Sequence, residues 1–211
     1  MLHAGLPVPR IIRPLIRATY RCGVWAMECK AFMYKLLWVE PVLRSVCHSV
    51  GTHLRAERLP YIRGKGVITL GDHVNLSGQS CFYFLHDMPQ TPAIEIGSHV
   101  FVGNGCTFSC AAGISVGDHG LISAGVRIHD NDGHPTDPTK RRAGAPLDPA
   151  SVRKVVIGDN VWIGAEAIVL KGVHIGDNAI VGSGAVVTSD VPANAVVAGN
   201  PAGIVHTKPG S

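Results

Sequence analysis

The chain has 211 residues, a formal net charge of +4 and 46% apolar residues, and it contains 25 glycines. This length buries a substantial core in one folded unit, and the glycine content suits many tight turns better than long helices. The positive charge is concentrated at one end, because residues 1–50 carry a net +5 and the remainder sums to −1. No basic, aromatic-bearing face runs through the rest of the chain, so nucleic-acid binding is not expected.

The N-terminal segment is expected to be helical. Arginine recurs every three or four residues between Arg10 and Arg21, and the stretch from Val24 to Val39 is largely apolar with interspersed aromatic residues. This pattern predicts one or two amphipathic helices that end near Pro41. Charged residues interrupt the apolar stretches, so a spanning helix is not expected, and no signal peptide is recognised.

Two roles for this basic segment remain open. A basic helix with aromatic side chains can lie on an anionic membrane surface, where each Lys or Arg contributes about 1 kcal/mol. Alternatively, residues 1–45 pack against the rest of the chain or against a neighbouring subunit. With no export signal and no Cys-x-x-Cys pair among six cysteines, buried reduced thiols and a cytoplasmic location are expected, with contact at the inner face of the membrane under the first role.

A six-residue period dominates the C-terminal half of the sequence. Apolar residues recur at Ile157, Ile163, Val169, Ile175, Val181 and Val187, and glycine follows most of them. The period fits neither a 3.6-residue helix nor the two-residue alternation of an ordinary strand. A broken version of the same pattern runs from Ile96 to Ile128. Independent strands of a sandwich would space their turns less evenly, so the pattern predicts a parallel β-helix, an all-β solenoid.

The predicted organisation has three parts. Residues 1–60 form the helical, basic extension, residues 61–205 form the repeat domain, and residues 206–211 form a C-terminal tail. The repeat stops between Ile128 and Val155, where residues 129–154 form an inserted loop. The loop begins His-Asp-Asn-Asp-Gly-His-Pro-Thr-Asp-Pro, which concentrates histidine and carboxylates. A loop of this length within a tight repeat is typical of a functional site.

Residues 66–205 resemble the hexapeptide-repeat acyltransferases, in particular the maltose, galactoside and nodulation O-acetyltransferase branch. The stretch from Val156 to Val205 matches the C-terminal signature of that branch, and His134-Pro135-x-Asp137-Pro138 matches its catalytic His-Pro segment. The resemblance implies a left-handed β-helix of about five to seven coils, a homotrimer with active sites between subunits, and acetyl-CoA as acyl donor.

The resemblance makes His134 the general base. Acetyl transfer to an alcohol requires removal of the hydroxyl proton, and a neutral imidazole with a free pKa of about 6.5 can accept it. His129 is the rival base. Asp130 and Asp132 either orient the imidazole or bind acceptor hydroxyl groups. We assign Asp132 to the catalytic group, and the expected acceptor-binding residues are Asn104, Asp130 and Asp137.

Cofactor contacts are carried over from the same family. The family often places basic residues after its Asn-Pro-Ala turn, where this chain has Gly203 and His206, so nearby lysines are expected to replace them at the nucleotide phosphates. The expected acetyl-CoA contacts are Trp162, Ala165, Ser183, Thr188, Ser189, Lys171 and Lys208.

The acceptor is less well defined by the sequence. The sugar-contacting Asn and Asp of the galactoside enzymes fall near Gly103 and Ala111, so those contacts are not reproduced. The loop motif and the basic N-terminal segment favour O-acetylation of a sugar in surface polysaccharide or lipopolysaccharide synthesis. The alternatives are N-acetylation of an amino-sugar nucleotide and a β-helix scaffold without catalysis.

A zinc enzyme related to the γ-carbonic anhydrases is the remaining competitor from another class. Its solenoid holds zinc with three histidines from adjacent coils. Here, His73, His99, His119 and His174 occupy positions where polar turn residues are routine. No metal is therefore expected.

Overall fold

The computed structural model describes residues 9–207, and it begins with a single long helical rod. A short 3-10 turn, η1 (Arg10–Ile12), leads into α1 (Arg13–Tyr34), a π-helical turn η2 (Lys35–Val39) and α2 (Glu40–Val46). The prediction that the helix ends near Pro41 is wrong. Proline lacks an N–H group and collides with the carbonyl four residues earlier, but the wider π turn directly before it accommodates the ring.

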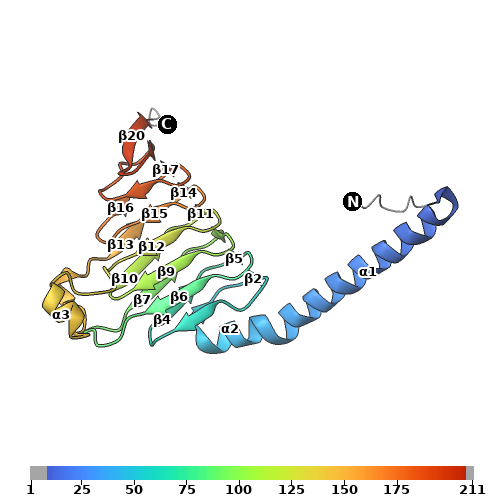
Figure 1. The fold of residues 1–211 in the computed structure, drawn as a ribbon, viewed down its shortest axis with the longest axis horizontal. Coiled ribbons are helices and arrows are strands. Elements are labelled where there is room, and N and C mark those ends of the chain that lie inside the picture. Colours follow the sequence, from blue (N-terminus) through green and yellow to red (C-terminus); the bar gives the residue numbers. More distant parts are fainter. Residues whose placement is uncertain (1–8, 208–211) are drawn as a thin grey trace, which may run out of the picture.

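The rod meets the rest of the molecule only through its last turns. Val39 and Leu43 are fully buried in the core, whereas no residue of Arg13–Tyr34 is buried. The Arg44 guanidinium also donates to the carbonyls of Val50 and Gly51 in the first coil, at 3.0 and 3.1 Å. α1 therefore projects away from the β-sheets, as Figure 1 shows.

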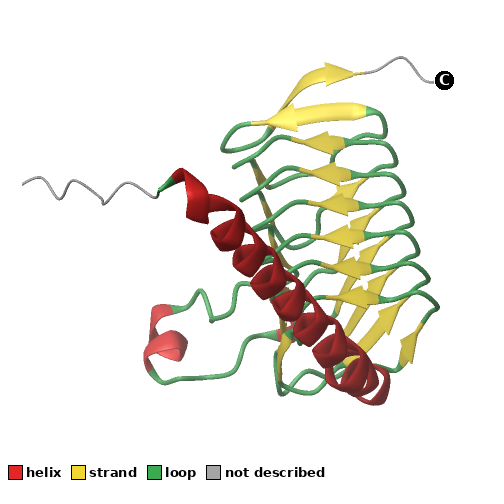
Figure 2. Cartoon of the chain, turned by 90° about the vertical axis from the view of Figure 1, so that its right-hand side faces the viewer, coloured by secondary structure: helices red, strands yellow, loops and turns green. Residues whose placement is uncertain are grey.

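The remainder is a parallel β-helix, as the repeat predicted, and it is left-handed, as the family resemblance implied; its stacked strands are seen side-on in Figure 2. Within the described residues it has three sheets. The first sheet is β1 (Ser49–Val50), β4 (Val67–Leu70), β7 (Ala93–Ile96), β10 (Gly113–Val116), β13 (Val155–Ile157) and β16 (His174–Ile175). The second is β2 (Arg55–Ala56), β5 (Asn75–Leu76), β8 (Phe101–Val102), β11 (Leu121–Ile122), β14 (Trp162–Ile163), β17 (Ile180–Val181), β19 (Ala195–Ala198) and β20 (Gly203–Thr207). The third is β3 (Tyr61–Arg63), β6 (Cys81–Phe84), β9 (Thr107–Cys110), β12 (Arg127–His129), β15 (Ile168–Val169) and β18 (Val186–Val187).

The coils extend beyond the boundaries assigned from the sequence. The first strand begins at Ser49, inside the segment assigned to the extension, and β20 runs through Thr207, inside the assigned tail. Ala56 and Ile62 keep the six-residue spacing, but Glu57 and Arg63 follow them instead of glycine, which concealed the first coil. β20 pairs antiparallel with β19, whereas the other strand pairs of residues 9–207 are parallel.

The core is a stack of apolar side chains inside the coils. The six-residue series Ile157, Ile163, Val169, Ile175, Val181 and Val187 is at most 2% exposed. Phe82 and Phe108 stack on adjacent coils with ring centroids 5.1 Å apart. The expectation of buried thiols is correct for Cys47, Cys106 and Cys110 and wrong for Cys22 and Cys29, which lie exposed on α1. Burial raises the pKa of Cys47 and of Cys106 to about 11.

Two loops interrupt the coils, where the sequence analysis recognised one. Residues 130–154 connect β12 to β13 and contain the short helices α3 (Pro138–Arg142) and η3 (Pro149–Ser151). Residues 85–92 connect β6 to β7, two coils earlier. Both connections run from the third sheet to the first, so both loops leave the same corner of the β-helix. The connection between them, from β9 to β10, has only Ala111 and Ala112.

Two further features of residues 9–207 concern membrane spans and metal ligands. Among these residues, none of the helices combines the length and apolar character that crossing a membrane requires. The same part of the chain holds no cluster of three His, Cys, Asp or Glu side chains able to ligate a metal ion.

Candidate active site

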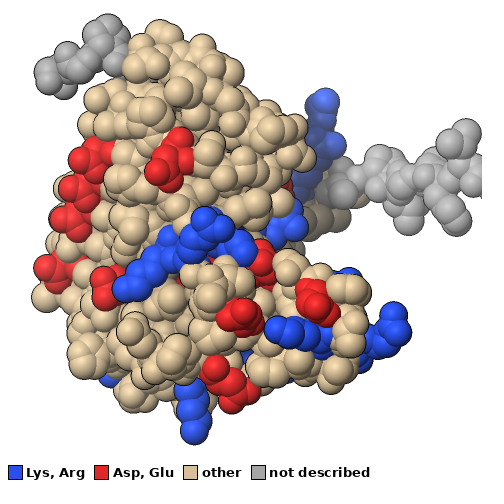
Figure 3. All heavy atoms as spheres, turned by 90° about the vertical axis from the view of Figure 1, so that its left-hand side faces the viewer, with Lys and Arg blue, Asp and Glu red and all other residues tan. Residues whose placement is uncertain are grey.

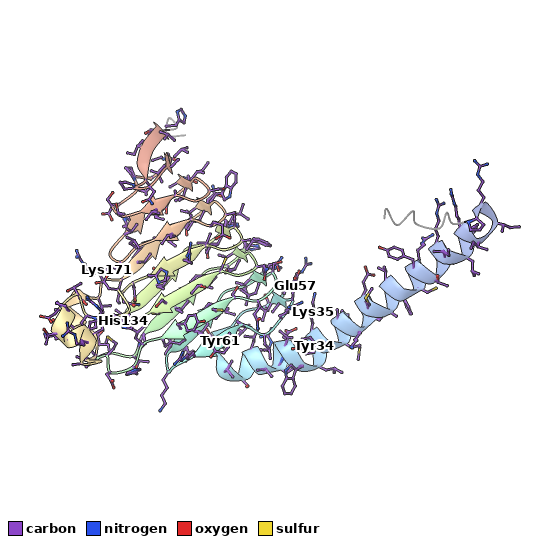
Figure 4. All side chains as sticks on the ribbon, viewed as in Figure 1. Tyr34, Lys35, Glu57, Tyr61, His134 and Lys171 are labelled. Carbon is purple, nitrogen blue, oxygen red and sulfur yellow. The ribbon has the colours of Figure 1, made fainter. Side chains whose placement is uncertain are left out.

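The two loops form the walls of one pocket of about 320 Å³ beside the β-helix. The longer loop contributes His134, Pro135 and Arg141 to its lining, and the shorter loop contributes His86 and Asp87. Figure 4 shows His134 at the edge of the molecule that carries α3, with Lys171 at the same edge. The predicted general base therefore lines a cavity built from two segments that are distant in sequence.

Asp130 anchors the base of the longer loop. Its carboxylate is fully buried and accepts hydrogen bonds from the backbone N–H groups of Ala111, Ala112 and Gly113, each at 2.7 Å. The Asn131 side-chain amide donates to Oδ1 of the same carboxylate at 2.8 Å. These contacts satisfy the amides of the tight β9–β10 corner. The structure thus gives Asp130 an anchoring position inside the protein, away from the acceptor hydroxyls that the sequence analysis assigned to it.

The backbone around His134 is held from both sides. On one side, the Gly133 N–H donates to the Asn131 side-chain oxygen at 2.9 Å. On the other, one nitrogen of the Arg141 guanidinium donates to the carbonyls of Pro135 and Thr136, at 3.0 and 2.9 Å. Pro135 is buried while His134 is exposed. The imidazole is therefore presented to solvent from a backbone segment of defined shape.

Asp132 and Lys171 form an ion pair across two coils. The Lys171 ammonium lies on the Asp132 carboxylate, and both side chains are partly buried. Lys171 follows β15, so the pair ties the loop to the next coil. The sequence analysis placed Asp132 in catalysis and Lys171 at the cofactor phosphates, and the structure brings the two together beside His134.

His129 lies at the end of β12, half-buried on the outer face of the third sheet. Burial lowers the pKa of its imidazole, the nearby Arg127 charge lowers it further, and Asp130 partly opposes the shift. His129 therefore keeps its neutral, proton-accepting form to lower pH than a free histidine. It stands at the start of the loop that carries His134, so the structure keeps both candidate bases at one corner.

Asp137 is the N-cap of α3. Its carboxylate accepts from the backbone N–H groups of Thr139 and Lys140, at 2.7 and 2.9 Å, and these bonds lower its pKa. The side chain is exposed, but both hydrogen-bond donors belong to the loop itself. Capping of this kind stabilises a helix, so Asp137 shapes the loop, which is a different role from the predicted acceptor contact.

The predicted cofactor residues lie along both edges of the third sheet. Ala165 and Ser183 occupy the corner that enters this sheet, where the Gly184 N–H donates to the Ala165 carbonyl at 2.8 Å. Thr188 and Ser189 follow β18 at the opposite corner, on the same side as Lys171 and the His134 loop. Only a narrow strip of sheet therefore separates the two groups.

Three further predicted residues have different settings. Trp162 is 47% exposed on β14 of the second sheet, and its indole N–H donates to the Ser123 hydroxyl at 3.3 Å. Asn104 lies at the corner that also carries Ala165, and its side-chain oxygen accepts from the Gln79 N–H at 3.0 Å. It is therefore at the opposite edge from His134. Lys208 lies outside the described residues.

The sequence analysis missed His86, Asp87, Arg127 and Arg141. A usable signal existed for the first two, because Leu85–Pro92 breaks the six-residue spacing and contains two prolines. Arg127 stands alone and Arg141 lies within the run Lys140-Arg141-Arg142, both in exposed positions, and no spacing rule distinguishes either residue. Their contacts with His129 and with the Pro135 carbonyl emerge only from the folded chain.

The anchoring position of Asp130 predicts a loss of stability on substitution. In Asp130→Ala, three corner N–H groups lose their acceptor, and each buried unsatisfied group costs about 1–3 kcal/mol. We expect the free energy of unfolding in urea to fall by about 3 kcal/mol or more. Asp132→Ala removes a partly exposed ion pair and should change it by about 1 kcal/mol or less. Equal effects of the two substitutions would contradict the anchoring position.

The environment of His129 predicts its titration. Its imidazole NMR signal should show a midpoint below about 6.5, the value for a free histidine. Arg127→Gln should raise that midpoint because it removes a neighbouring positive charge. The unfolded chain binds this proton more readily than the folded chain does. The free energy of unfolding therefore decreases as the pH drops from about 6.5 towards the pKa of His129 in the folded state. A titration midpoint at or above the value for a free histidine would contradict the half-buried position of His129 beside Arg127.

Comparisons with known proteins bear on the whole repeat region. Residues 154–189 match the family described as bacterial transferase hexapeptide (six repeats), and residues 93–129 match hexapeptide repeat of succinyl-transferase. Nodulation protein L of Rhizobium meliloti (strain 1021) is 50% identical over 109 residues, covering 52% of this chain and 57% of that protein. Galactoside O-acetyltransferase of Lactococcus lactis subsp. lactis (strain IL1403) is 38% identical over 108 residues, covering 51% and 50%. The chain thus spans about half the length of these curated relatives.

Solved structures share the fold at lower identity. AntD, an N-acyltransferase from Bacillus cereus in complex with dTDP and 3-hydroxybutyryl-CoA, superposes with a TM-score of 0.65 at 20% identity, covering 81% of this chain and 88% of that one. A hexapeptide-repeat containing acetyltransferase from Vibrio cholerae O1 biovar eltor, complexed with acetyl coenzyme A, gives 0.56 at 24% identity, covering 80% and 75%. The family matches flank the inserted loop on both sides, from β7 to β12 and from β13 to β18. With the relatives, they confirm the predicted resemblance to the hexapeptide-repeat transferases on both sides of the loop.

Proposed function

We propose that this protein is an acetyl-CoA-dependent O-acetyltransferase that acylates a hydroxyl group of a sugar, in the modification of surface polysaccharide or lipopolysaccharide. The observation that carries the proposal is His134, an exposed imidazole on a braced loop that lines a pocket beside the hexapeptide coils. The name of the relative from Lactococcus, galactoside O-acetyltransferase, supports the same chemistry.

His134 acts as the general base. Its imidazole takes the proton of the acceptor hydroxyl as the oxygen attacks the thioester carbonyl carbon. The resulting tetrahedral intermediate collapses with cleavage of the carbon–sulfur bond, and the imidazolium returns the proton to the CoA thiolate. A base of this kind contributes about 10²–10⁴-fold to the rate. Asp132, paired with Lys171, keeps the loop next to the following coil, and His129 is the second candidate base.

CoA would bind along the third sheet, between the two rows of predicted residues. Ala165 and Ser183 are small, so an extended pantetheine arm can approach the backbone at their corner. Thr188, Ser189 and Lys171 offer hydroxyl and ammonium groups at the other corner. Figure 3 shows Lys and Arg side chains gathered on the face that carries the inserted loop, where phosphates would find positive charge. The two solved neighbours each contain an acyl-CoA, which supports this class of cofactor.

The proposed assembly is a homotrimer. An apolar stripe follows the outer face of the second sheet, where Leu121 pairs in register with Phe101 on one side and Trp162 on the other. Leu121 and Trp162 are 42% and 47% exposed in the single chain. A neighbouring subunit would cover this stripe and would bring Trp162 to the groove for the pantetheine arm.

Contact with a membrane surface is the proposed role of α1. Arg13, Arg17 and Arg21 recur every four residues and therefore share one side of the helix, while Leu15 and Met33, which are 66% and 47% exposed, lie on the opposite side. A helix of this composition lies in the plane of an anionic bilayer with its apolar side among the acyl chains. The acceptor would then be a sugar on a carrier at that surface.

N-acylation of an amino-sugar nucleotide remains the alternative reaction. The AntD neighbour is an N-acyltransferase that was also solved with dTDP-4-amino-4,6-dideoxyglucose, but its 18% identity in that complex supports only the shared fold. A non-catalytic scaffold fits the pocket less well, because it gives no reason for a braced loop that presents His134.

The general-base role predicts a large loss of activity. CoA release from acetyl-CoA, followed by thiol detection over a panel of sugars, amino-sugar nucleotides and polysaccharide fragments, should fall by roughly 100-fold or more in His134→Ala. His48→Ala, at an exposed histidine near the first coil, should leave it unchanged. Release that survives His134→Ala but not His129→Gln would transfer the base role to His129. Failure to bind CoA and to release it with every acceptor would overturn the function.

The membrane proposal predicts charge-dependent partition. Arg17→Glu combined with Arg21→Glu should reduce co-sedimentation with phosphatidylglycerol-containing vesicles at least about 10-fold, since each basic residue contributes about 1 kcal/mol. Arg58→Glu combined with Arg63→Glu, on exposed coil positions, is the matched control. Unchanged partition of the helix variant, or dissociation of an oligomer by Trp25→Ala, would favour packing of α1 against a neighbouring subunit.

A further inference from the structure

The shorter of the two loops, residues 85–92, has no role in the proposed reaction so far, although it lines the same pocket as the longer loop. Both leave the same corner of the β-helix, two coils apart, and a corner of two residues lies between them. The stem of residues 85–92 is fixed at both ends, because the Leu85 N–H donates to the Cys110 carbonyl and the Val67 N–H to the Pro92 carbonyl, each at 2.9 Å. The loop therefore projects from a rigid base towards the His134 loop.

A histidine–carboxylate pair stands where the shorter loop meets the pocket. The His86 Nδ1 lies 2.5 Å from the Asp87 carboxylate, and both residues line the pocket together with His134. Asp87 has a left-handed backbone, with φ of 61°, which turns the chain sharply at this point. The two side chains are 87% and 66% exposed, so their polar atoms are accessible to a ligand.

The chemistry of this pair suits hydroxyl groups. A carboxylate accepts hydrogen bonds from hydroxyls, and an imidazole oriented by a carboxylate presents its second nitrogen as a further hydrogen-bonding group. The pocket volume of about 320 Å³ is at the small end of the range for small-ligand sites, about 300–1,000 Å³. It therefore suits one sugar ring better than a longer chain, and the negative charge of Asp87 disfavours an acidic ring.

We propose that His86 and Asp87 form the acceptor-recognition arm of the site and bind hydroxyl groups of a neutral sugar ring while His134 takes the proton from the hydroxyl that is acylated. The arm offers contacts in place of the Asn and Asp whose positions fall near Gly103 and Ala111 here. This inference rests on the proposed function, since it assigns the acceptor side of the same pocket. His86 and Asp87 are specificity-determining residues, and the acyl donor does not contact them.

The test compares Asp87→Asn and His86→Gln with Gln90→Ala. Gln90 lies on the same loop but lines the neighbouring cavity beside Lys65, not the pocket of His134, so it controls for general disturbance of the loop. Kinetics with the best neutral sugar of the panel should show KM for the acceptor raised at least tenfold by either pair substitution. KM for acetyl-CoA, the pH profile of kcat and the thermal unfolding midpoint should not change. Asp87→Asn should also lower the ratio of kcat/KM for neutral acceptors to kcat/KM for uronic-acid acceptors.

Each other outcome has a definite meaning. An unchanged acceptor KM, or an equal change in Gln90→Ala, would overturn the recognition arm. A lower kcat with a displaced pH profile would place the pair in proton transfer, which also overturns it. If the wild type neither binds CoA nor transfers acetyl groups, the proposed function fails. The arm is then judged by titrating galactose, glucose and mannose against the His86 imidazole NMR signal, assigned with His86→Gln: movement of that signal supports it, and a static signal overturns it.

Discussion

The in-register stacking of coils is the constraint on which the rest of this molecule depends. Each coil hydrogen-bonds to the next, and each six-residue step buries two apolar side chains, such as Val173 and Ile175. A residue added within a strand would therefore shift every following side chain off the core. Insertions are therefore tolerated only at corners. The two long ones leave the same corner, and the stacking alone brings His134 and the His86–Asp87 pair to one pocket.

Within that corner, the carboxylates have divided roles that depend on burial. Asp130 and Asp132 are two residues apart in one polar stretch, yet the first is fully buried on three backbone N–H groups and the second reaches an ammonium on the next coil. The buried carboxylate fixes where the loop begins. The more exposed pair then limits how far the loop can swing. Together, the Asp130 hydrogen bonds and the Asp132–Lys171 ion pair hold the loop, and with it the His134 imidazole, in a defined position.

The sequence predicted the features that repeat and missed those that depend on distant contacts. The spacing from Ile157 to Val187 was sufficient for the β-helix, and the interruption of that spacing was sufficient to locate the longer loop, which lines a pocket. The first coil was missed because Glu57 replaces the usual glycine, and the helix was ended too early because a π turn before Pro41 is not visible in composition. Asp130 could not be separated from Asp132, since only the folded corner of Ala111–Gly113 distinguishes them.

The histidines of the early coils show why position within the repeat matters more than residue type. His53, His73, His99 and His119 stack with ring centroids 4.4–4.9 Å apart, all with left-handed backbones, and Asn160, Asn178 and Asn194 continue the same backbone conformation in later coils. Nearly parallel rings direct their nitrogen lone pairs side by side, whereas a zinc site needs them to converge. A histidine at the repeating turn position of the coils therefore has a structural role in the turn. His86 and His134 lie in segments that interrupt the repeat, so their side chains do not form part of a coil turn and remain accessible to a ligand.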